Sequence, residues 1–317
     1  MCGVSVIIPI YGVEKYIERC ARSLMEQTLA DIEYIFVNDY TPDHSIDILN
    51  QVIEDYPHRK EQVKILSTPK NSGQTIAREL GRKASSGEYL IFCDSDDWVE
   101  KDMYEKMYTK AKQGDYDIVK CRHFRSDFSG KEYVVKEQIS DNQLDFIKGL
   151  LSRKIFGTLW STLIRRSLFE CDIVFPKDNI REDLTLLVQL AYYSKSIGLV
   201  NQALYHYCIQ GGSTSFAPNN EKLASMHIKT CNNLLIISNF LEDKQISHLC
   251  SREIKMQKFN IKQVICPLAK DAHYKDIWDN CFPELRPWEI IFYNEPLRRK
   301  IKYLLTLIGI YPLKCCK

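Results

Sequence analysis

Four short apolar runs alternate with amphipathic segments at the start of the chain, and this alternation constrains the fold more than any other feature. The runs have the length and the branched or aromatic composition of buried strands, and they lie at residues 4–9, 32–37, 63–66 and 89–93. Between them, apolar residues recur at helical spacing, as in residues 76–84. Successive strand–helix–strand units place their strands in parallel. The sequence therefore predicts an α/β fold with a mostly parallel sheet and helices on both faces.

An acidic tetrad, Asp94-Ser95-Asp96-Asp97, directly follows the fourth apolar run. Carboxylates at the carboxyl end of such a strand face the crevice in which open α/β sheets bind ligands. Acids this close repel one another unless a cation lies between them, and Mg²⁺ or Mn²⁺ would leave coordination positions free for phosphates. The tetrad indicates a metal–phosphate site. The alternative is a strand-to-helix turn in which Asp96 or Asp97 caps the next helix.

A second Asp-x-Asp triplet, Asp115-Tyr116-Asp117, has a different setting. It precedes the strand-like run at residues 118–121 and so lies at the amino end of a strand, away from the expected ligand edge. We predict that these acids are solvated turn residues.

The length of 317 residues is enough for one large core and an appendage. A net charge of +2 gives no electrostatic argument for a nucleic-acid partner.

The 12 cysteines show no Cys-x-x-Cys pair and no zinc spacing, so Cys20, Cys93 and Cys121 are predicted to be small core residues. The first apolar run is too short for a secretory signal, and we expect reduced thiols in a cytosolic compartment. Walker and Gly-x-Gly-x-x-Gly motifs are absent, which argues against P-loop and dehydrogenase functions.

Further motifs follow the predicted strands in a fixed order. They are the run Val4–Tyr11, Val37-Asn38-Asp39, Asn71-Ser72-Gly73 with Ala77-Arg78, the acidic tetrad, Trp160, Arg181-Glu182-Asp183, Tyr205-His206-Tyr207 and Ser213. In this order the chain resembles glycosyltransferase family 2 over roughly residues 3–217. That family has the GT-A fold, which is Rossmann-like, and its members transfer sugars from nucleotide diphosphate donors with inversion.

The resemblance, together with a loss of glycines after about residue 218, implies the domain organisation. We expect a GT-A catalytic domain at residues 1–217 and a helical C-terminal extension at 218–317. Within the catalytic domain, residues 1–97 would form the nucleotide-sugar half and residues 98–217 the acceptor half.

The resemblance also implies which residues hold the nucleotide. Pro9 and Tyr11 stand where the first strand of the family contacts the base, and Asp39 matches the acid that binds uracil. Arg78 matches a basic residue that faces the nucleotide, and Asp94 matches the acid near the ribose.

For the chemistry, the resemblance implies that Asp96 binds the divalent ion, Mn²⁺ or Mg²⁺, that bridges the diphosphate. Asp183 stands at the position of the catalytic base, which would take the proton of the acceptor hydroxyl. A loop around residues 211–213 is suited to close over the site and exclude water.

Three of these residues also have a structural interpretation. Asp39 could begin an Asx-type turn, and Arg78 could be a solvated residue paired with Glu79 or Asp43. Asp183 could be a first-turn acid that is favoured by the helix dipole.

The chain departs from the family pattern at three positions. Tyr40 stands where glycine is common, Thr162 where lysine is common, and Cys208 where arginine is common. Fewer cations leave the diphosphate more dependent on the metal. These departures keep open the alternative of a non-catalytic nucleotide-sugar-binding partner subunit. A metal-dependent nucleotidyl- or phosphotransferase on a related sheet is the other alternative function.

Near the C-terminus, basic residues at 298–302 precede an apolar octet at 303–310. The octet is too short to span a bilayer. The segment 298–317 therefore indicates either peripheral contact with a membrane surface or a C-terminal helix packed on the fold.

Taken together, the motifs and the resemblance predict a cytoplasmic, metal-dependent inverting glycosyltransferase. We expect it to transfer a sugar from a UDP-sugar donor to a hydroxyl of a glycan or lipid-linked acceptor in surface polysaccharide synthesis.

Overall fold

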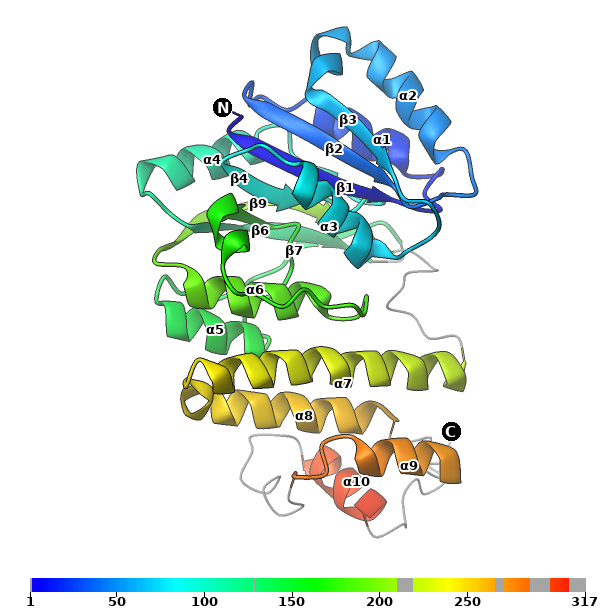
Figure 1. The fold of residues 1–317 in the computed structure, drawn as a ribbon, viewed down its shortest axis with the longest axis vertical. Coiled ribbons are helices and arrows are strands. Elements are labelled where there is room, and N and C mark those ends of the chain that lie inside the picture. The colour runs from blue at the N-terminus through cyan, green and yellow to red at the C-terminus, as the bar shows by residue number, and fades with distance from the viewer. Residues whose placement is uncertain (1, 128, 210–218, 266–270, 286–296, 308–317) are drawn as a thin grey trace. The chain divides into compact units, whose positions relative to one another are not determined.

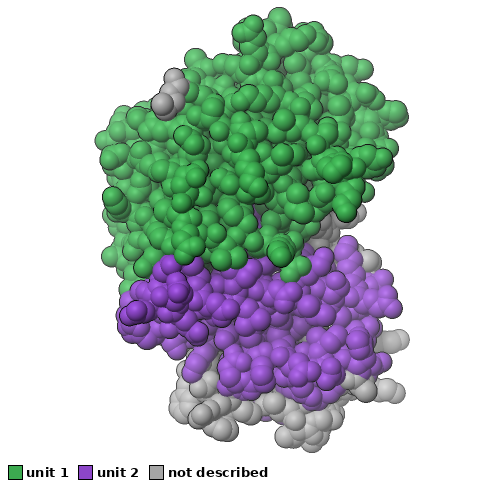
Figure 2. All heavy atoms as spheres, in the orientation of Figure 1, with its two compact units in different colours: residues 1–179, 186–211 green, residues 180–185, 212–317 purple. Residues whose placement is uncertain are grey.

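The computed structural model describes residues 2–127, 129–209, 219–265, 271–285 and 297–307. The chain divides into two compact units, which Figure 2 colours separately. The first unit contains residues 1–179 and 186–211, and the second contains residues 180–185 and 212–317. The domain boundary predicted at 217–218 lies outside the described residues.

The first unit is built on one sheet, whose described strands run in the order β3-β2-β1-β4-β8-β6-β9-β5, with β7 paired to β6. The strands are β1 (Val4–Ile10), β2 (Ile32–Asn38), β3 (Val63–Ser67), β4 (Tyr89–Phe92), β5 (Trp98–Val99), β6 (Ile118–Ser126), β7 (Glu132–Val134), β8 (Thr162–Arg165) and β9 (Ile197–Tyr207). The first four strands are parallel, as the alternating pattern predicts. Beyond them, β8 pairs antiparallel with both β4 and β6, whereas β6 and β9 are parallel. The α/β class is confirmed.

Helices cover both faces of this sheet (Figure 1). They are α1 (Ile17–Met25), α2 (Ser45–Asp55), α3 (Gln74–Ala84), α4 (Met103–Gln113), α5 (Gln143–Leu151) and the later part of α6 (Glu182–Tyr193). Because side chains alternate along a strand, Val6 and Ile8 of β1 enter the core shared with α1, α2 and α4. Ile7 faces the other side, where a Cβ added at Gly81 of α3 would lie 2.4 Å from its Cγ2. The glycine lets α3 pack close to the strands whose carboxyl ends carry the predicted site.

The described part of the second unit is helical. It contains the first turn of α6 and the helices α7 (Asn220–Asp243), α8 (Ser251–Ile265), α9 (Ala272–Asn280) and α10 (Leu297–Leu307). Asn219 caps α7 by accepting a hydrogen bond from the Lys222 amide. None of the helices described has the length and apolar character needed to cross a bilayer. Of the predicted membrane-contact segment, residues 308–317 lie outside the described residues.

The cysteines differ in part from the sequence expectation. Cys20, Cys93 and Cys121 are buried in the first unit, as predicted. Cys231 and Cys281, however, form a disulfide within the second unit, where only thiols were expected. The two residues are separated by 50 positions, and no local spacing signals a pairing that depends on how α7 and α9 pack.

Candidate functional site

Five of the predicted site residues come from one edge of the parallel sheet. Pro9 is buried near the end of β1, and Tyr11 follows that strand. Asp39 follows β2, and the loop after β4 carries Asp94 and Asp96. Because these strands are parallel and in register, their carboxyl ends lie together. The edge predicted to bind a ligand thus gathers the acids that the sequence analysis selected.

Asp94 is bound by two side chains of α3. Its Oδ1 accepts hydrogen bonds from Arg78 Nη2 and from Gln74 Nε2, each at 2.8 Å. Arg78 is buried, so the alternative of a solvated arginine paired with Glu79 or Asp43 is wrong. Glu79 pairs with Arg82 instead, at 2.8 Å. The Arg78–Asp94 ion pair fixes the start of the tetrad loop against α3.

Asp39 is buried and organises the loop that leads into α3. Its carboxylate accepts hydrogen bonds from Thr68 Oγ1 at 2.7 Å and from the amides of Ser72 and Gly73 at 2.8 and 2.7 Å. The alternative of an Asx-type turn made by Asp39 is wrong, because Asn38 Oδ1 accepts from the Thr41 amide. Asp39 therefore holds a loop that borders the ligand edge.

The last acid of the tetrad is a structural anchor that the sequence analysis missed. Asp97 is buried, and its carboxylate accepts hydrogen bonds from Tyr205 Oη at 2.7 Å and from the Cys208 amide at 2.8 Å. The Tyr205 hydroxyl also accepts from the Asp94 amide at 3.1 Å. Burial and the charges of Asp96 and Asp94 raise the pKa of Asp97 well above its usual range. The capping alternative is wrong, because α4 begins at Met103, after Asp102.

Removing the Tyr205 hydroxyl tests this anchor. Tyr205→Phe deprives the buried Asp97 carboxylate of a donor, so the free energy of unfolding should fall by about 1–3 kcal/mol. Tyr207→Phe is the matched control. The Tyr207 and Trp160 rings stack with their centroids 5.8 Å apart, and the Tyr207 hydroxyl makes no hydrogen bond to the four tetrad residues. It should change the unfolding free energy by less than about 0.5 kcal/mol. Equal losses for both variants in urea unfolding would contradict the role of the Tyr205 hydroxyl.

Asp96 is partly exposed, and its chemistry fits a hard divalent cation. Burial, followed by the charge of Asp94, raises the pKa of the Asp96 carboxyl to about 6. Two carboxylates on one short loop thus repel each other, and a cation between them would relieve that repulsion. An all-oxygen donor set of this kind suits Mg²⁺ or Mn²⁺.

A cation from another element reaches Cys208, the position at which this chain lacks the arginine common in the family. Arg19 of α1 is exposed and donates from Nη2 to Cys208 Sγ at 3.0 Å and to the Asp96 carbonyl at 3.3 Å. The sequence analysis missed Arg19, because it lies in an ordinary amphipathic helix far from the other motifs.

Two tyrosines are exposed near the ends of β1 and β2. Tyr11 is 48% exposed and Tyr40 is 64% exposed. Tyr40 has a φ of 57°, in the left-handed region that favours glycine. The glycine common at this position in the family therefore has a backbone reason.

Thr162 lies buried in β8, where its Oγ1 donates to the Thr158 carbonyl at 2.7 Å. A lysine nevertheless lies next to this position. Lys120 of β6 pairs with Thr162 across the two strands, and its side chain is also buried. Lys120 donates from Nζ to Ser161 Oγ at 2.7 Å.

Asp183 is the second residue of α6 and belongs to the second unit. It is partly exposed, whereas Glu182 beside it is buried. The segment 180–185 is held by α7 and α8: Asn233 Nδ2 donates to the Ile180 carbonyl at 2.7 Å, and Arg181 donates to Gln257 Oε1 at 2.7 Å. The assignment of Asp183 as the base stays a prediction.

The second Asp-x-Asp triplet has a structural role. Asp115 and Asp117 both accept hydrogen bonds from Arg165, at 2.6 and 2.8 Å. Asp115 is exposed, as predicted, but the Asp117 side chain is only 14% exposed, so it is an ion-paired residue and not a solvated one.

Known proteins resemble this chain in sequence and in fold. The family model described as "Glycosyl transferase family 2" matches residues 5–172. The "Uncharacterized glycosyltransferase EpsJ" of Bacillus subtilis is 32% identical over 212 residues, which cover 64% of this chain and 60% of EpsJ. The match thus spans less than two thirds of that relative.

Two solved structures share the fold. S. aureus TarS 1-349 in complex with UDP-GlcNAc has a TM-score of 0.59 at 20% identity, over 92% of this chain and 93% of that chain. The Pyrobaculum calidifontis mannosyltransferase PcManGT, in complex with GDP-Man and Mn²⁺, has a TM-score of 0.54 at 13% identity. The match covers 97% of this chain and 86% of that chain. These likenesses support a GT-A arrangement of the sheet and its helices.

Proposed function

The chain belongs to glycosyltransferase family 2, and from this premise we propose that it is a metal-dependent, inverting enzyme with a UDP-sugar donor. It would transfer the sugar to a hydroxyl of a glycan or lipid-linked acceptor in surface polysaccharide synthesis. The observation that carries the proposal is the convergence of Asp39, the Arg78–Asp94 ion pair and Asp96 at one edge of the parallel sheet.

In this proposal the nucleotide lies along the ends of β1 and β2. Asp39 would bind the base from a loop that its own hydrogen bonds hold in place. The exposed rings of Tyr11 and Tyr40 would offer apolar surface to the base, and Asp94, fixed by Arg78, would accept from the ribose hydroxyls.

Asp96, with Asp94 beside it, would hold Mn²⁺ or Mg²⁺. A divalent ion there supplies charge neutralisation of the leaving diphosphate. The chain would add Arg19, whose guanidinium lies at Cys208 and can replace the arginine common at that position.

Asp183 would take the proton of the acceptor hydroxyl as the hydroxyl attacks opposite the leaving group, which inverts the anomeric centre. The loop at 211–213, which we predict to exclude water, lies outside the described residues.

The proposal is tested by incubating the purified chain with Mn²⁺, membrane-derived acceptors and one nucleotide sugar at a time. We expect a UDP-sugar to give labelled glycan and free UDP. Transfer from a GDP-sugar alone would overturn the donor. Release of pyrophosphate would indicate a nucleotidyltransferase, and binding of UDP-sugars without turnover on any acceptor would indicate a partner subunit.

Residues 298–317 enter the proposal as a basic segment that contacts an anionic membrane surface carrying the acceptor. In the described part of this segment, Arg298 and Ile301 of α10 are both exposed. Each basic residue near the surface contributes ~1 kcal/mol, so binding to anionic vesicles should weaken sharply as salt rises. Vesicle sedimentation that is absent or insensitive to salt would favour a helix packed on the fold.

A further inference from the structure

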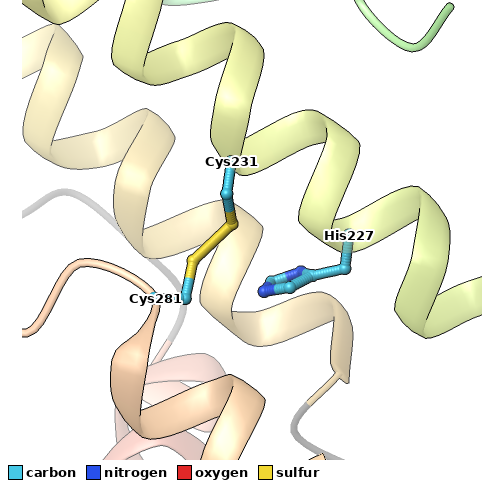
Figure 3. Close-up of side chains that lie close together, drawn as sticks. All are labelled: His227, Cys231 and Cys281. Atoms are coloured by element: carbon cyan, nitrogen blue, oxygen red, sulfur yellow. A yellow bond between two sulfur atoms is a disulfide. The ribbon is translucent and has the colours of Figure 1, made fainter. Parts of the chain in front are cut away.

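Three side chains that can bind a metal meet inside the second unit, apart from the acids of the sheet edge. His227 and Cys231 lie on α7, and Cys281 directly follows α9 (Figure 3). Their candidate ligand atoms all lie within 4.8 Å of one another. His227 and Cys231 are four residues apart on one helix and therefore project from the same face.

His227 provides the observation that points to a ligand. Its side chain is buried, with 2% of its surface exposed, and neither ring nitrogen has a hydrogen-bond partner among the described residues. Buried imidazoles are normally hydrogen-bonded through at least one nitrogen. A neutral imidazole carries a lone pair on one ring nitrogen, so the unpartnered ring of His227 can offer that nitrogen to a ligand.

The surroundings of the three side chains are buried and contain a cation. Trp278 of α9 is buried and donates from Nε1 to the Lys262 carbonyl at 3.0 Å. The Lys262 ammonium lies 4.6 Å from the centroid of the Trp278 ring. Its positive charge acts on the buried His227 imidazole, so the ammonium belongs to the surroundings of the three side chains.

Cys231 and Cys281 are joined as a disulfide in the structure, so two redox states have to be considered. A phosphine supplies the two electrons that break the S–S bond, and one water supplies two protons and an oxygen, which leaves two thiols and a phosphine oxide. A divalent ion then displaces the two thiol protons and bonds to both sulfurs.

We propose that, in the reduced chain, His227, Cys231 and Cys281 form a Zn²⁺ site with one imidazole and two thiolate ligands. Nitrogen and sulfur ligands select Zn²⁺ over Mg²⁺ and Mn²⁺, which prefer oxygen, so this site is chemically distinct from the one at Asp96. With three protein ligands, the fourth position is open to water or another small ligand. The disulfide and the metal are two ways of tying α7 to the end of α9.

The test uses the full chain, reduced with a phosphine and titrated with Co²⁺ as a spectroscopic substitute for Zn²⁺. Excess Mg²⁺ keeps the oxygen-ligand site occupied. We expect a thiolate-to-cobalt absorption band that saturates at about one ion per chain and is displaced by Zn²⁺. The chain left oxidised should show no such band, and this comparison needs no substitution.

Cys231→Ser and Cys281→Ser should each abolish the band or weaken it severely, and His227→Ala should lower the affinity for Zn²⁺ at least tenfold. Cys250→Ser is the matched control, because Cys250 is a buried cysteine of the same unit outside the cluster. It should bind like the unmodified chain, and circular dichroism checks that each variant folds. A reduced chain without the band would overturn the site. So would a band that survives both cysteine substitutions, or a Zn²⁺ affinity that His227→Ala leaves unchanged.

Discussion

Replacing Asp183 with asparagine is expected to lower the rate of sugar transfer by ~10²-fold or more, which corresponds to roughly 3 kcal/mol of activation free energy. Asparagine keeps the size and most of the hydrogen-bonding shape of the side chain, but it cannot accept the proton of the acceptor hydroxyl. Affinities for UDP and for the metal should change little. Steady-state transfer assays, with calorimetric titration of UDP and Mn²⁺, measure both quantities.

Glu182→Gln is the matched control, because it makes the same chemical change one residue earlier in the first turn of α6. Glu182 is buried, whereas Asp183 is partly exposed and therefore better placed to meet a substrate. The control should be much milder in transfer. If Asp183 only stabilises the helix through its dipole, the asparagine variant should lose about 0.3–1 kcal/mol of stability and transfer at a near wild-type rate. That outcome would remove Asp183 from the mechanism.

Asp96→Asn is expected to abolish the metal-dependent part of the stabilisation by UDP. At ligand a hundredfold above its dissociation constant, that stabilisation should be ~2.7 kcal/mol in the unmodified chain and should vanish with a chelator. Without ligand, the variant should be more stable than the unmodified chain at pH 7. The folded chain raises the pKa of Asp96 to about 6. Its ionised form therefore destabilises the fold above that pH, and this effect disappears as the pH falls towards the unfolded value of about 3.9.

The control for Asp96 comes from the other acidic triplet. Asp115 is exposed and has a φ of 46°, a conformation that asparagine adopts readily. Asp115→Asn weakens an ion pair with Arg165 but should leave the response to UDP and Mn²⁺ intact. Thermal unfolding with each ligand and with chelator compares the variants. Stabilisation by UDP that persists in Asp96→Asn, or that is lost in Asp115→Asn, would contradict the assignment of the metal to the tetrad.

The first half of the fold was predictable because its signals are local. Strand and helix periods over residues 4–93 reproduce β1 to β4 and the helices between them, since each βαβ unit is short and right-handed connections leave few alternatives. The insertion of β8 between β4 and β6 was not predictable. It depends on pairing between segments far apart in the chain, and a four-residue strand carries no signal that selects its partner.

The same distinction applies to the site. The acids after β2 and β4 were found because their positions at strand ends are visible in the sequence. The hydrogen bonds of Tyr205 to Asp97 and of Arg19 to Cys208 join residues 108 and 189 positions apart, and no local pattern records such contacts. Asp97 was visible as a member of the tetrad, but its role as an anchor can be recognised only when the position of β9, which carries Tyr205, is known.

The division of the chain into units has a consequence for truncation and for domain exchange. The two residues that lead into α6, just before Asp183, are held by Asn233 and Gln257 from helices that lie beyond the part matched by the family model. A chain shortened after residue 217 would keep every described strand and all four acids at the sheet edge, yet it would lose both of these anchors. We therefore expect a chain that ends at residue 217 to bind the nucleotide-sugar donor but not to transfer the sugar. A chimaera that borrows the C-terminal helices of a relative would have to borrow the segment at 180–185 with them.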